Sequence, residues 1–237
     1  RLRYAVAAMS VPAPHNEILL DFQRRERLGL EEAILCPGKT REHLLQIFAA
    51  ADEVGRSLLL TRLDAAQLAA LPDDARARID YEPLSRTGYY GPVPEPTAPP
   101  RVAIVAAGTS DAFVTREIER TLRYYGHASS SFIDVGLAGM WRLMSKLEAI
   151  QRHPIVIVVA GMDAALPTAV GGLVSGVVIA VPTSTGYGVA SGGRAALGAI
   201  LSSCSPGLLT LNIDNGYGAA CAAARVLRVM DGSSARP

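Results

Sequence analysis

The sequence predicts an α/β fold in which a three-layer, doubly wound parallel sheet follows a smaller N-terminal α/β domain. From residue 101 onward, apolar strand-like runs alternate strictly with helix-spaced apolar residues. Such alternation requires crossover connections, hence a parallel sheet covered by helices on both faces. The segment 91–100, GPVPEPTAPP, holds five prolines, which favour extended backbone without regular structure. We therefore expect domains at 1–90 and 101–237, joined by a linker at 91–100.

The N-terminal domain is predicted from three short patterns. Glu17 to Leu28 is charge-rich and helical in spacing, and Thr40 to Val54 has the spacing of an amphipathic helix that stops at Gly55. Ser57 to Leu60 is a short apolar run that predicts a strand. Together they indicate a small α/β unit.

The C-terminal domain is predicted element by element from apolar periodicity. The expected strands are Val102 to Ala106, Ile155 to Ala160, Val177 to Val181 and Leu208 to Leu211. The expected helices are Val114 to Tyr125, ended by Gly126, then Met140 to Ile150, a short helix from Asp163, a helix from Arg194, and a last helix from Asn215 to Val229.

Composition narrows the class of partner. The formal net charge is +1, so no strong field points to nucleic acid or to an acidic membrane surface. Three scattered cysteines and four scattered histidines indicate neither a disulfide framework nor an intrinsic metal site. The longest apolar stretches, in 154–162 and 169–181, are shorter than the roughly 20 residues of a membrane helix. We expect a cytoplasmic protein that binds a small molecule, without nucleic acid or membrane.

Small polar residues and glycines cluster after the predicted strands. In parallel α/β sheets, ligands bind outside the carboxyl ends of the strands, where loops and helix N-termini present unpaired backbone N–H groups. The clusters are Gly108-Thr109-Ser110-Asp111, Gly161-Met162-Asp163, Pro182 to Gly188, and Asn212 to Gly216. We expect these four loops to converge on one crevice.

Each cluster also has an ordinary structural interpretation. Gly108 to Asp111 suits a phosphate cradle, but equally a tight turn in which Ser110 or Asp111 caps the next helix. Thr183 to Gly193 has four glycines around Tyr187; it suits closure over a flat heterocycle, or a plain flexible loop. It lacks the spacing of a dinucleotide fingerprint or a P-loop.

The remaining candidates have the same ambiguity. Asp214-Asn215-Gly216 is a hairpin signal, but the alanine-rich residues after it favour a helix, whose start would hold the amides of Asn212 and Asn215 near sugar hydroxyls or a carboxylate. Asp163 suits a helix dipole, and a cysteine such as Cys204 is most often a buried small apolar residue.

Several motifs in order resemble one family. VAGMDAALP (159–167), AVPTSTGYG (180–188), SSCSPG (202–207) and NIDNGYGAA (212–220) resemble the LarB family, pyridinium-3,5-biscarboxylate mononucleotide synthases. The GTSD turn at Gly108 is similar to the family's first phosphate-side loop. Upstream, Asp21, Arg24, Arg27 and Gly29, then Gly38-Lys39-Thr40, resemble its D-x-x-R-x-x-R-x-G and GKT elements. The resemblance implies a flavodoxin-like C-terminal domain similar to aminoimidazole ribonucleotide (AIR) carboxylase.

The resemblance also implies a reaction. The substrates would be nicotinic acid adenine dinucleotide and CO2 or bicarbonate, and the products a dicarboxylated pyridinium mononucleotide for the nickel-pincer cofactor and AMP. Cys204 would act as the nucleophile and Asp163 would remove the ring proton. No organic cofactor is expected, and Mg²⁺ would serve the hydrolysis step. The expected substrate-binding residues are Gly108, Thr109, Ser110, Asp111, Thr183, Ser184, Gly186, Tyr187, Gly188, Asn212, Asp214, Asn215, Arg24 and Lys39.

This chain departs from the family pattern at three positions. Asp163 stands where the family usually has glutamate, Trp141 stands where the AG-x-H-R stretch has histidine, and Phe22 often corresponds to a histidine. The departures at Trp141 and Asp163 favour one alternative, a nucleotide-binding module without catalysis. A second alternative is an AIR carboxylase or mutase of purine synthesis, against which Trp141, Cys204 and the GKT-containing unit count. Cys204 precedes the last strand and so lies at its amino end, opposite the crevice. We expect a homo-oligomer, an octamer by analogy with the related carboxylases, in which a neighbour's crevice receives Cys204.

Overall fold

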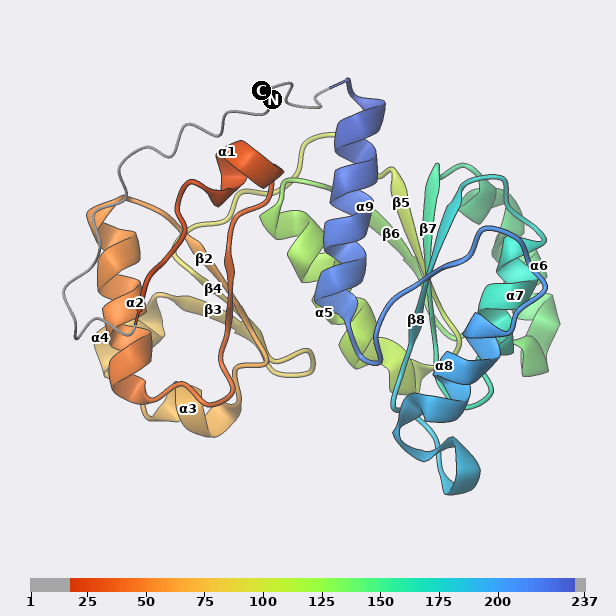
Figure 1. Ribbon diagram of the computed structural model, residues 1–237, viewed down its shortest axis with the longest axis horizontal. Coiled ribbons are helices and arrows are strands. Elements are labelled where there is room, and N and C mark those ends of the chain that lie inside the picture. Colours follow the sequence, from red (N-terminus) through yellow and green to blue (C-terminus); the bar gives the residue numbers. More distant parts are fainter. Residues whose placement is uncertain (1–17, 233–237) are drawn as a thin grey trace, which may run out of the picture.

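A computed structural model describes residues 18–232 as two α/β halves that lie side by side (Figure 1). The N-terminal half has a four-stranded sheet with the order β1-β2-β4-β3. Its strands are β1 (Ala33–Leu35), β2 (Leu58–Thr61), β3 (Ile79–Glu82) and β4 (Thr87–Tyr90). β1 and β2 are parallel, whereas β4 is antiparallel to both β2 and β3.

Four helices accompany this sheet: α1 (Arg24–Leu28), α2 (Arg41–Glu53), α3 (Ala65–Ala69) and α4 (Asp73–Ala77). The Thr40 hydroxyl accepts the His43 N–H at 3.2 Å, which caps α2. The predicted helix at 40–54 is thereby confirmed. The predicted helix at 17–28 was too long: it is helical only over α1, and Glu17 lies outside the described residues.

The C-terminal half contains five parallel strands in the order β6-β5-β7-β8-β9. The strands are β5 (Val102–Ala106), β6 (Ser129–Phe132), β7 (Ile155–Ala160), β8 (Val177–Pro182) and β9 (Leu209–Thr210). Numbered within this half, the order is 2-1-3-4-5, which is the flavodoxin-like order whose switch point lies between the first and third strands. The predicted doubly wound parallel sheet is confirmed.

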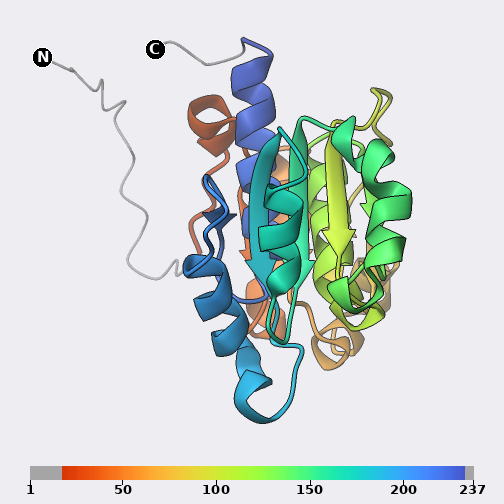
Figure 2. The same cartoon turned by 90° about the vertical axis from the view of Figure 1, so that its right-hand side faces the viewer.

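Helices cover both faces of this sheet and make three layers (Figure 2). α5 (Ala112–Tyr124) and α9 (Gly216–Met230) pack on one face, and α6 (Met140–Gln151), α7 (Ala165–Gly171) and α8 (Arg194–Leu201) pack on the other. Short 3-10 turns lie at Thr109–Asp111, Leu137–Gly139 and Gly188–Gly193. β5 and β7 are buried along their whole length, as expected for central strands of a parallel sheet.

In the C-terminal half, β6 and α7 differ from their sequence-based expectation. β6 was not expected, because its sequence SSSF is polar and it forms an edge of the sheet. α7 begins at Ala165 rather than at Asp163. Met162 and Ala164 have left-handed backbone, with φ of 56° and 50°, so helical dihedrals begin only after them.

Helix α5 lies between the two sheets and contacts both halves. On its N-terminal-half side, the Tyr89 hydroxyl donates to the Arg120 carbonyl at 2.6 Å, and the Arg120 guanidinium lies 3.9 Å from the Tyr89 ring centroid. The Tyr124 hydroxyl contacts Glu31 Oε2 at 2.7 Å and the Ser57 carbonyl at 2.8 Å. The halves therefore meet through specific polar contacts. None of the helices within residues 18–232 is long and apolar enough to cross a membrane.

Candidate functional site

The loops after β5, β7, β8 and β9 meet at the carboxyl edge of the parallel sheet. The Thr183 hydroxyl donates to Asp111 Oδ1 at 2.6 Å and joins the β8 loop to the β5 loop. The Met162 N–H donates to the Thr185 carbonyl at 2.8 Å and joins the β7 loop to the β8 loop. The β8 loop is thus bonded to two neighbours, and its contact with the β9 loop is described below.

Asp111 holds the β5 and β8 loops in place. Its side chain is 3% exposed and that of Thr183 is fully buried, and Asp111 Oδ2 accepts the Gly108 N–H at 3.1 Å. Burial raises the pKa of Asp111, an effect partly offset by the Thr183 and Gly108 hydrogen bonds. Both residues were expected to bind substrate, which stays a prediction; in the structure they position the two loops through their mutual hydrogen bond.

Gly161 allows the β7 and β8 loops to approach closely. A Cβ atom at this position would lie 2.4 Å from the Thr185 carbonyl oxygen and 2.5 Å from Thr183 Oγ1. Both atoms belong to the β8 loop, which is hydrogen-bonded to Asp111 and Met162, so a side chain at Gly161 would force the two loops apart. The sequence placed Gly161 beside the crevice, and this contact gives the reason for a glycine there.

Left-handed backbone at non-glycine residues gathers at this edge. Residues 18–232 contain six such positions, and four of them follow strands of the parallel sheet: Asp134, Met162, Ala164 and Asp214. Each such conformation costs of the order of 1–2 kcal/mol for an L residue. Strain of this kind clusters at functional sites, where the surrounding contacts enforce it.

The β9 loop leads directly into α9, so the hairpin interpretation of Asp214-Asn215-Gly216 is excluded. Asn215 Oδ1 accepts the Gly218 N–H at 2.8 Å and caps α9, and Asn212 Oδ1 accepts the Ile213 N–H at 2.9 Å. Both amide oxygens are engaged in local hydrogen bonds, and the expected donor role of the two amides stays a prediction. Asp214 Oδ1 accepts the Ser184 N–H at 2.8 Å and links the β8 and β9 loops.

Several side chains of these loops face solvent. The exposed residues are Thr109, Ser110, Asp163, Tyr187 and Asn212. The Asp163 carboxylate also accepts the Ala165 N–H at 3.3 Å through Oδ1. Tyr187, in the glycine-rich loop that also holds Gly186 and Gly188, is 78% exposed. The four loops therefore present two hydroxyls, a carboxylate, an amide and an aromatic ring on a frame of hydrogen bonds.

Cys204 lies away from these loops. It is exposed and belongs to the connection between α8 and β9, which reaches β9 at its amino end. The neighbouring Ser203 hydroxyl lies 2.7 Å from the Thr168 hydroxyl of α7. Within one protomer, Cys204 and Asp163 thus belong to opposite edges of the sheet, as the sequence predicts.

Arg24 and Lys39 occupy different ends of the N-terminal half. Arg24 lies on α1, next to the C-terminal part of α9 (Figure 1). Lys39 follows β1, and its carbonyl accepts a hydrogen bond from Gln67 Nε2 at 3.0 Å. The charge of Arg24 acts on Tyr217 and Cys221 of α9, and Lys39 lines a pocket with His43 and Ile47 of α2. In the D-x-x-R-x-x-R-x-G element, Asp21 pairs with Arg27 rather than with Arg24.

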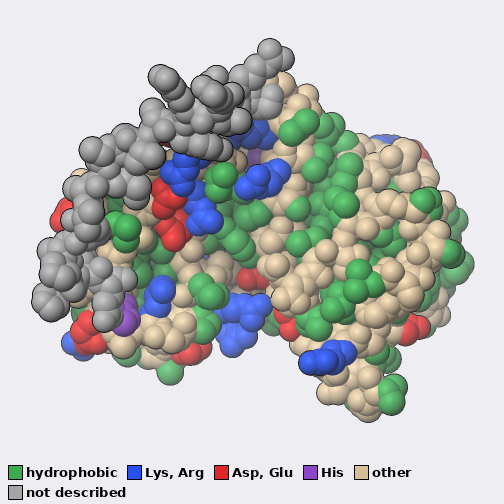
Figure 3. Space-filling view, in the orientation of Figure 1, with side chains coloured by type: hydrophobic (Ala, Val, Ile, Leu, Met, Phe, Trp, Pro, Cys, Tyr) green, Lys and Arg blue, Asp and Glu red, His purple; other side chains and the backbone are tan. Residues whose placement is uncertain are grey.

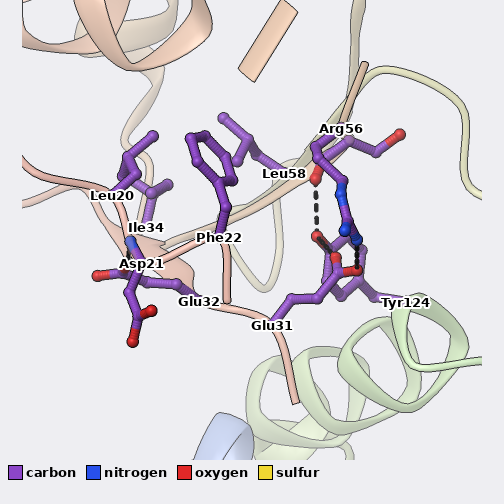
Figure 4. Close-up of a pocket in the computed structure, with 10 residues that line it drawn as sticks. Leu20, Asp21, Phe22, Glu31, Glu32, Ile34, Arg56, Leu58 and Tyr124 are labelled. Atoms are coloured by element: carbon purple, nitrogen blue, oxygen red, sulfur yellow. Dashed lines mark hydrogen bonds and ion pairs between the residues drawn. The ribbon is translucent and has the colours of Figure 1, made fainter. Parts of the chain in front are cut away.

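Phe22 lines a pocket between the two halves (Figure 4). Glu31 is the polar centre of this pocket, because its Oε1 accepts from Arg56 Nη1 at 3.0 Å while its Oε2 accepts from the Tyr124 hydroxyl. Glu31, Arg56 and Tyr124 thus form hydrogen bonds to one another, and these bonds link the N-terminal half to α5. Trp141 is 73% exposed on α6, and the next residue, Arg142, pairs with Asp134 of the β6 loop.

Three charged residues near the crevice were missed from the sequence. Glu117 of α5 is 6% exposed, and its Oε2 accepts the Tyr217 N–H at 3.2 Å. Burial raises its pKa, and the Tyr217 N–H and Arg62 oppose that effect. Arg62 and Arg86 come from the N-terminal half. For Glu117 a signal existed, since it follows Val114 by three residues on the inward face of a predicted helix.

Comparisons with known proteins cover both halves. Residues 16–91 match the family model described as the LarB/PurE-like N-terminal domain, and residues 101–236 match that of AIR carboxylase. An uncharacterized protein of Methanocaldococcus jannaschii is 32% identical over 228 residues, which cover 91% of this chain and 86% of that protein. The crystal structure of a PurE2 variant of Treponema denticola is similar at 21% identity, with a TM-score of 0.44, over 57% of this chain and 92% of that one.

Proposed function

Since this chain belongs to the LarB family, with a LarB/PurE-like N-terminal domain ahead of an AIR carboxylase domain, we propose that it carboxylates nicotinic acid adenine dinucleotide. In the same active site, water then cleaves the phosphoanhydride and releases AMP. The products are AMP and a pyridinium mononucleotide with a second carboxylate. The family membership supports a carboxylase role, and the choice of substrate is our proposal.

The observation that carries this proposal is the exposed thiol of Cys204. A pyridinium carbon is electron-poor and cannot attack CO2, so the reaction needs a nucleophile that first adds to the ring. Cys204 is the exposed one of the three cysteines. Burial raises the pKa of the other two thiols, to about 12 for Cys36, which disfavours their thiolates. An AIR carboxylase acting on an electron-rich aminoimidazole has no such need for a thiol.

The proposed carboxylation balances as follows. The Cys204 thiolate adds to the pyridinium ring and forms a carbon–sulfur bond, which leaves an enamine-like carbon that attacks CO2. The Asp163 carboxylate removes the proton at the newly carboxylated carbon. The electron pair of that C–H bond restores the aromatic ring and expels the thiolate. Exposed Asp163, held between two left-handed residues at the crevice, is placed on a loop suited to this role.

The hydrolysis adds water across the phosphoanhydride. Residues 18–232 contain no group of three or more His, Cys, Asp or Glu side chains that could hold a metal ion. Mg²⁺ at phosphate sites is typically held by one or two carboxylates together with the substrate's phosphates. A Mg²⁺ ion that neutralises the phosphates would therefore enter with the substrate.

The proposed site is shared between protomers of a homo-oligomer, because Cys204 and the crevice lie at opposite edges of one sheet. Large apolar side chains support an interface on the face formed by α6 and on the loop before α8. Met140, Trp141 and Met144 are at least 50% exposed, and Val189 is 99% exposed. Exposed apolar groups in such number mark interaction surfaces. An octamer is the expected order.

The direct test is turnover. The protein is incubated with nicotinic acid adenine dinucleotide and bicarbonate, and in parallel with aminoimidazole ribonucleotide and bicarbonate, and products are identified by mass spectrometry. AMP together with a mononucleotide heavier by one carboxylate supports the proposal. Carboxylation of aminoimidazole ribonucleotide alone would identify a purine enzyme, and binding without turnover a nucleotide-binding module.

Cys204→Ala tests the covalent step. We expect this variant to lose carboxylation by several orders of magnitude while its affinity for the dinucleotide stays within about 2-fold, because the thiol acts on the ring and not on the phosphates. Cys221→Ala is the matched control, since that thiol is partly buried against tyrosines, and it should retain activity. Normal turnover by Cys204→Ala would refute the covalent mechanism.

A further inference from the structure

Two arginines of the N-terminal half lie where that half meets the candidate crevice. Arg62 directly follows β2, and Arg86 directly precedes β4. The Leu63 N–H donates to the Arg86 carbonyl at 2.8 Å, so the two turns are bonded side by side. Arg62 and Arg86 line one pocket together with Phe113 and Glu117 of α5 and Asp214 of the β9 loop.

Both arginines have left-handed backbone, with φ of 54° at Arg62 and 52° at Arg86. Among residues 18–232, they complete the set of six non-glycine positions of this kind, and the other four follow strands of the parallel sheet. Glycine or asparagine would adopt this conformation at lower cost. Left-handed arginines held next to each other therefore point to a functional demand on their side chains.

Neither arginine forms an ion pair with Glu117 or Asp214, although the Arg62 charge opposes the rise in the pKa of Glu117. The Asp214 carboxylate accepts the Ser184 N–H, and that of Glu117 accepts the Tyr217 N–H. Arg62 Nη2 donates at 3.1 Å to the Asp214 backbone carbonyl, which is a neutral acceptor. The Arg86 side chain is exposed and forms no hydrogen bond or ion pair within the described part of the chain. Figure 3 shows basic side chains gathered in the notch between the halves.

Asp214 connects this pocket to the crevice. Its carboxylate holds the β8 loop through Ser184, while its carbonyl holds Arg62. Planar guanidinium groups recognise phosphate through paired, charge-assisted hydrogen bonds. A molecule whose ring occupies the crevice and which continues past Asp214 would bring its next anionic group to the two arginines.

We propose that Arg62 and Arg86 form a pyrophosphate-binding subsite that the N-terminal half adds to the catalytic half. This inference rests on the proposed function in naming the ligand, the phosphoanhydride bridge of the dinucleotide. It gives the N-terminal half a part in the reaction: that half holds the bond that water cleaves, while the crevice holds the ring.

The test is calorimetric titration of wild-type protein and of Arg86→Asn, because asparagine tolerates a left-handed φ and the variant keeps its fold. We expect about 10- to 100-fold weaker binding of nicotinic acid adenine dinucleotide, the effect of losing charge-assisted bonds to phosphate. Nicotinic acid mononucleotide, which lacks the bridge, should lose less than about 3-fold. Arg62→Asn should also weaken binding of the dinucleotide. Because Arg62 is hydrogen-bonded to the Asp214 carbonyl, the midpoint of its thermal unfolding is compared with that of wild type to show whether the loss of affinity comes from a less stable fold.

Arg225→Gln is the control, since Arg225 is an exposed arginine near the other end of α9, and its affinity should match wild type. Unchanged dinucleotide affinity in Arg86→Asn would overturn the subsite. If the wild-type protein binds no dinucleotide, the proposed function fails by itself, and inorganic pyrophosphate then decides: binding that depends on Arg86 supports the subsite, and binding that does not refutes it.

Discussion

Asp111 and Glu117 are buried carboxyl groups whose hydrogen bonds organise the crevice from behind. Both accept backbone N–H groups, and burial raises the pKa of each. A carboxyl group with a raised pKa in the folded state favours the protonated form there. Its contribution to stability is present at low pH and is lost as pH rises from its ordinary pKa through the raised one.

Glu117→Gln tests this sign. We expect the free energy of unfolding of the wild-type protein to fall relative to that of the variant as pH rises from about 4.5, the ordinary value for glutamate, toward 7. Glutamine keeps an acceptor for the Tyr217 N–H but carries no charge. Urea titrations at several pH values measure the difference. Glu148→Gln is the control, because that side chain is 84% exposed, and its free energy of unfolding should change with pH as that of wild type does. If the free energy of unfolding of Glu117→Gln also followed wild type at every pH, the raised pKa of Glu117 would be contradicted.

Individual elements show what the sequence could and could not predict. β5 and β7 were predicted residue for residue, because they are apolar along their whole length. β1, β3, β4 and β6 were missed, because they are short or polar and form strands through pairing with distant neighbours. A local run of apolar residues predicts which strands are buried. It does not predict which distant strand each one pairs with.

The same limit applied to the candidate site. The convergence of four loops followed from strand order, whereas the buried pair of Asp111 and Thr183 is separated by 72 residues and has no local signal. Arg62 and Arg86 could not be predicted as site residues for the same reason. They come together only because the fold places their two turns side by side, facing the other half. Cys204 was placed correctly at the amino end of β9 from topology alone.

Helix α2 offers an element-scale prediction. Thr40 caps it, with the His43 side chain accepting the Thr40 N–H in return. Thr40→Ala should lower the free energy of unfolding by about 1 kcal/mol, because an N-terminal N–H loses its acceptor. The urea midpoint would report the loss. Thr40→Ser keeps the hydroxyl and should stay close to wild type; equal losses in both variants would show that the cap contributes nothing.

At the scale of the whole molecule, the apolar surface predicts assembly. Sedimentation should give a species several times the 24.9 kDa of one chain, with the octamer as the expected order. Trp141→Ser removes a large exposed apolar side chain and should shift the distribution toward smaller species, with activity falling in proportion. Val54→Ser, at an apolar residue 49% exposed beyond the end of α2, is the control. A fully active monomer would contradict the shared site.

The two sheets also share one helix. Tyr89 and Tyr124 bind α5 to the N-terminal half, while the opposite side of α5 is packed into the core of the parallel sheet. If the C-terminal half were produced alone, from the linker onward, it would keep α5. The surface of α5 that contacts Tyr89 and the Ser57 carbonyl would then be exposed to solvent. Attaching a different N-terminal half to this parallel-sheet half would therefore require redesign of the α5 residues that contact Tyr89 and Ser57.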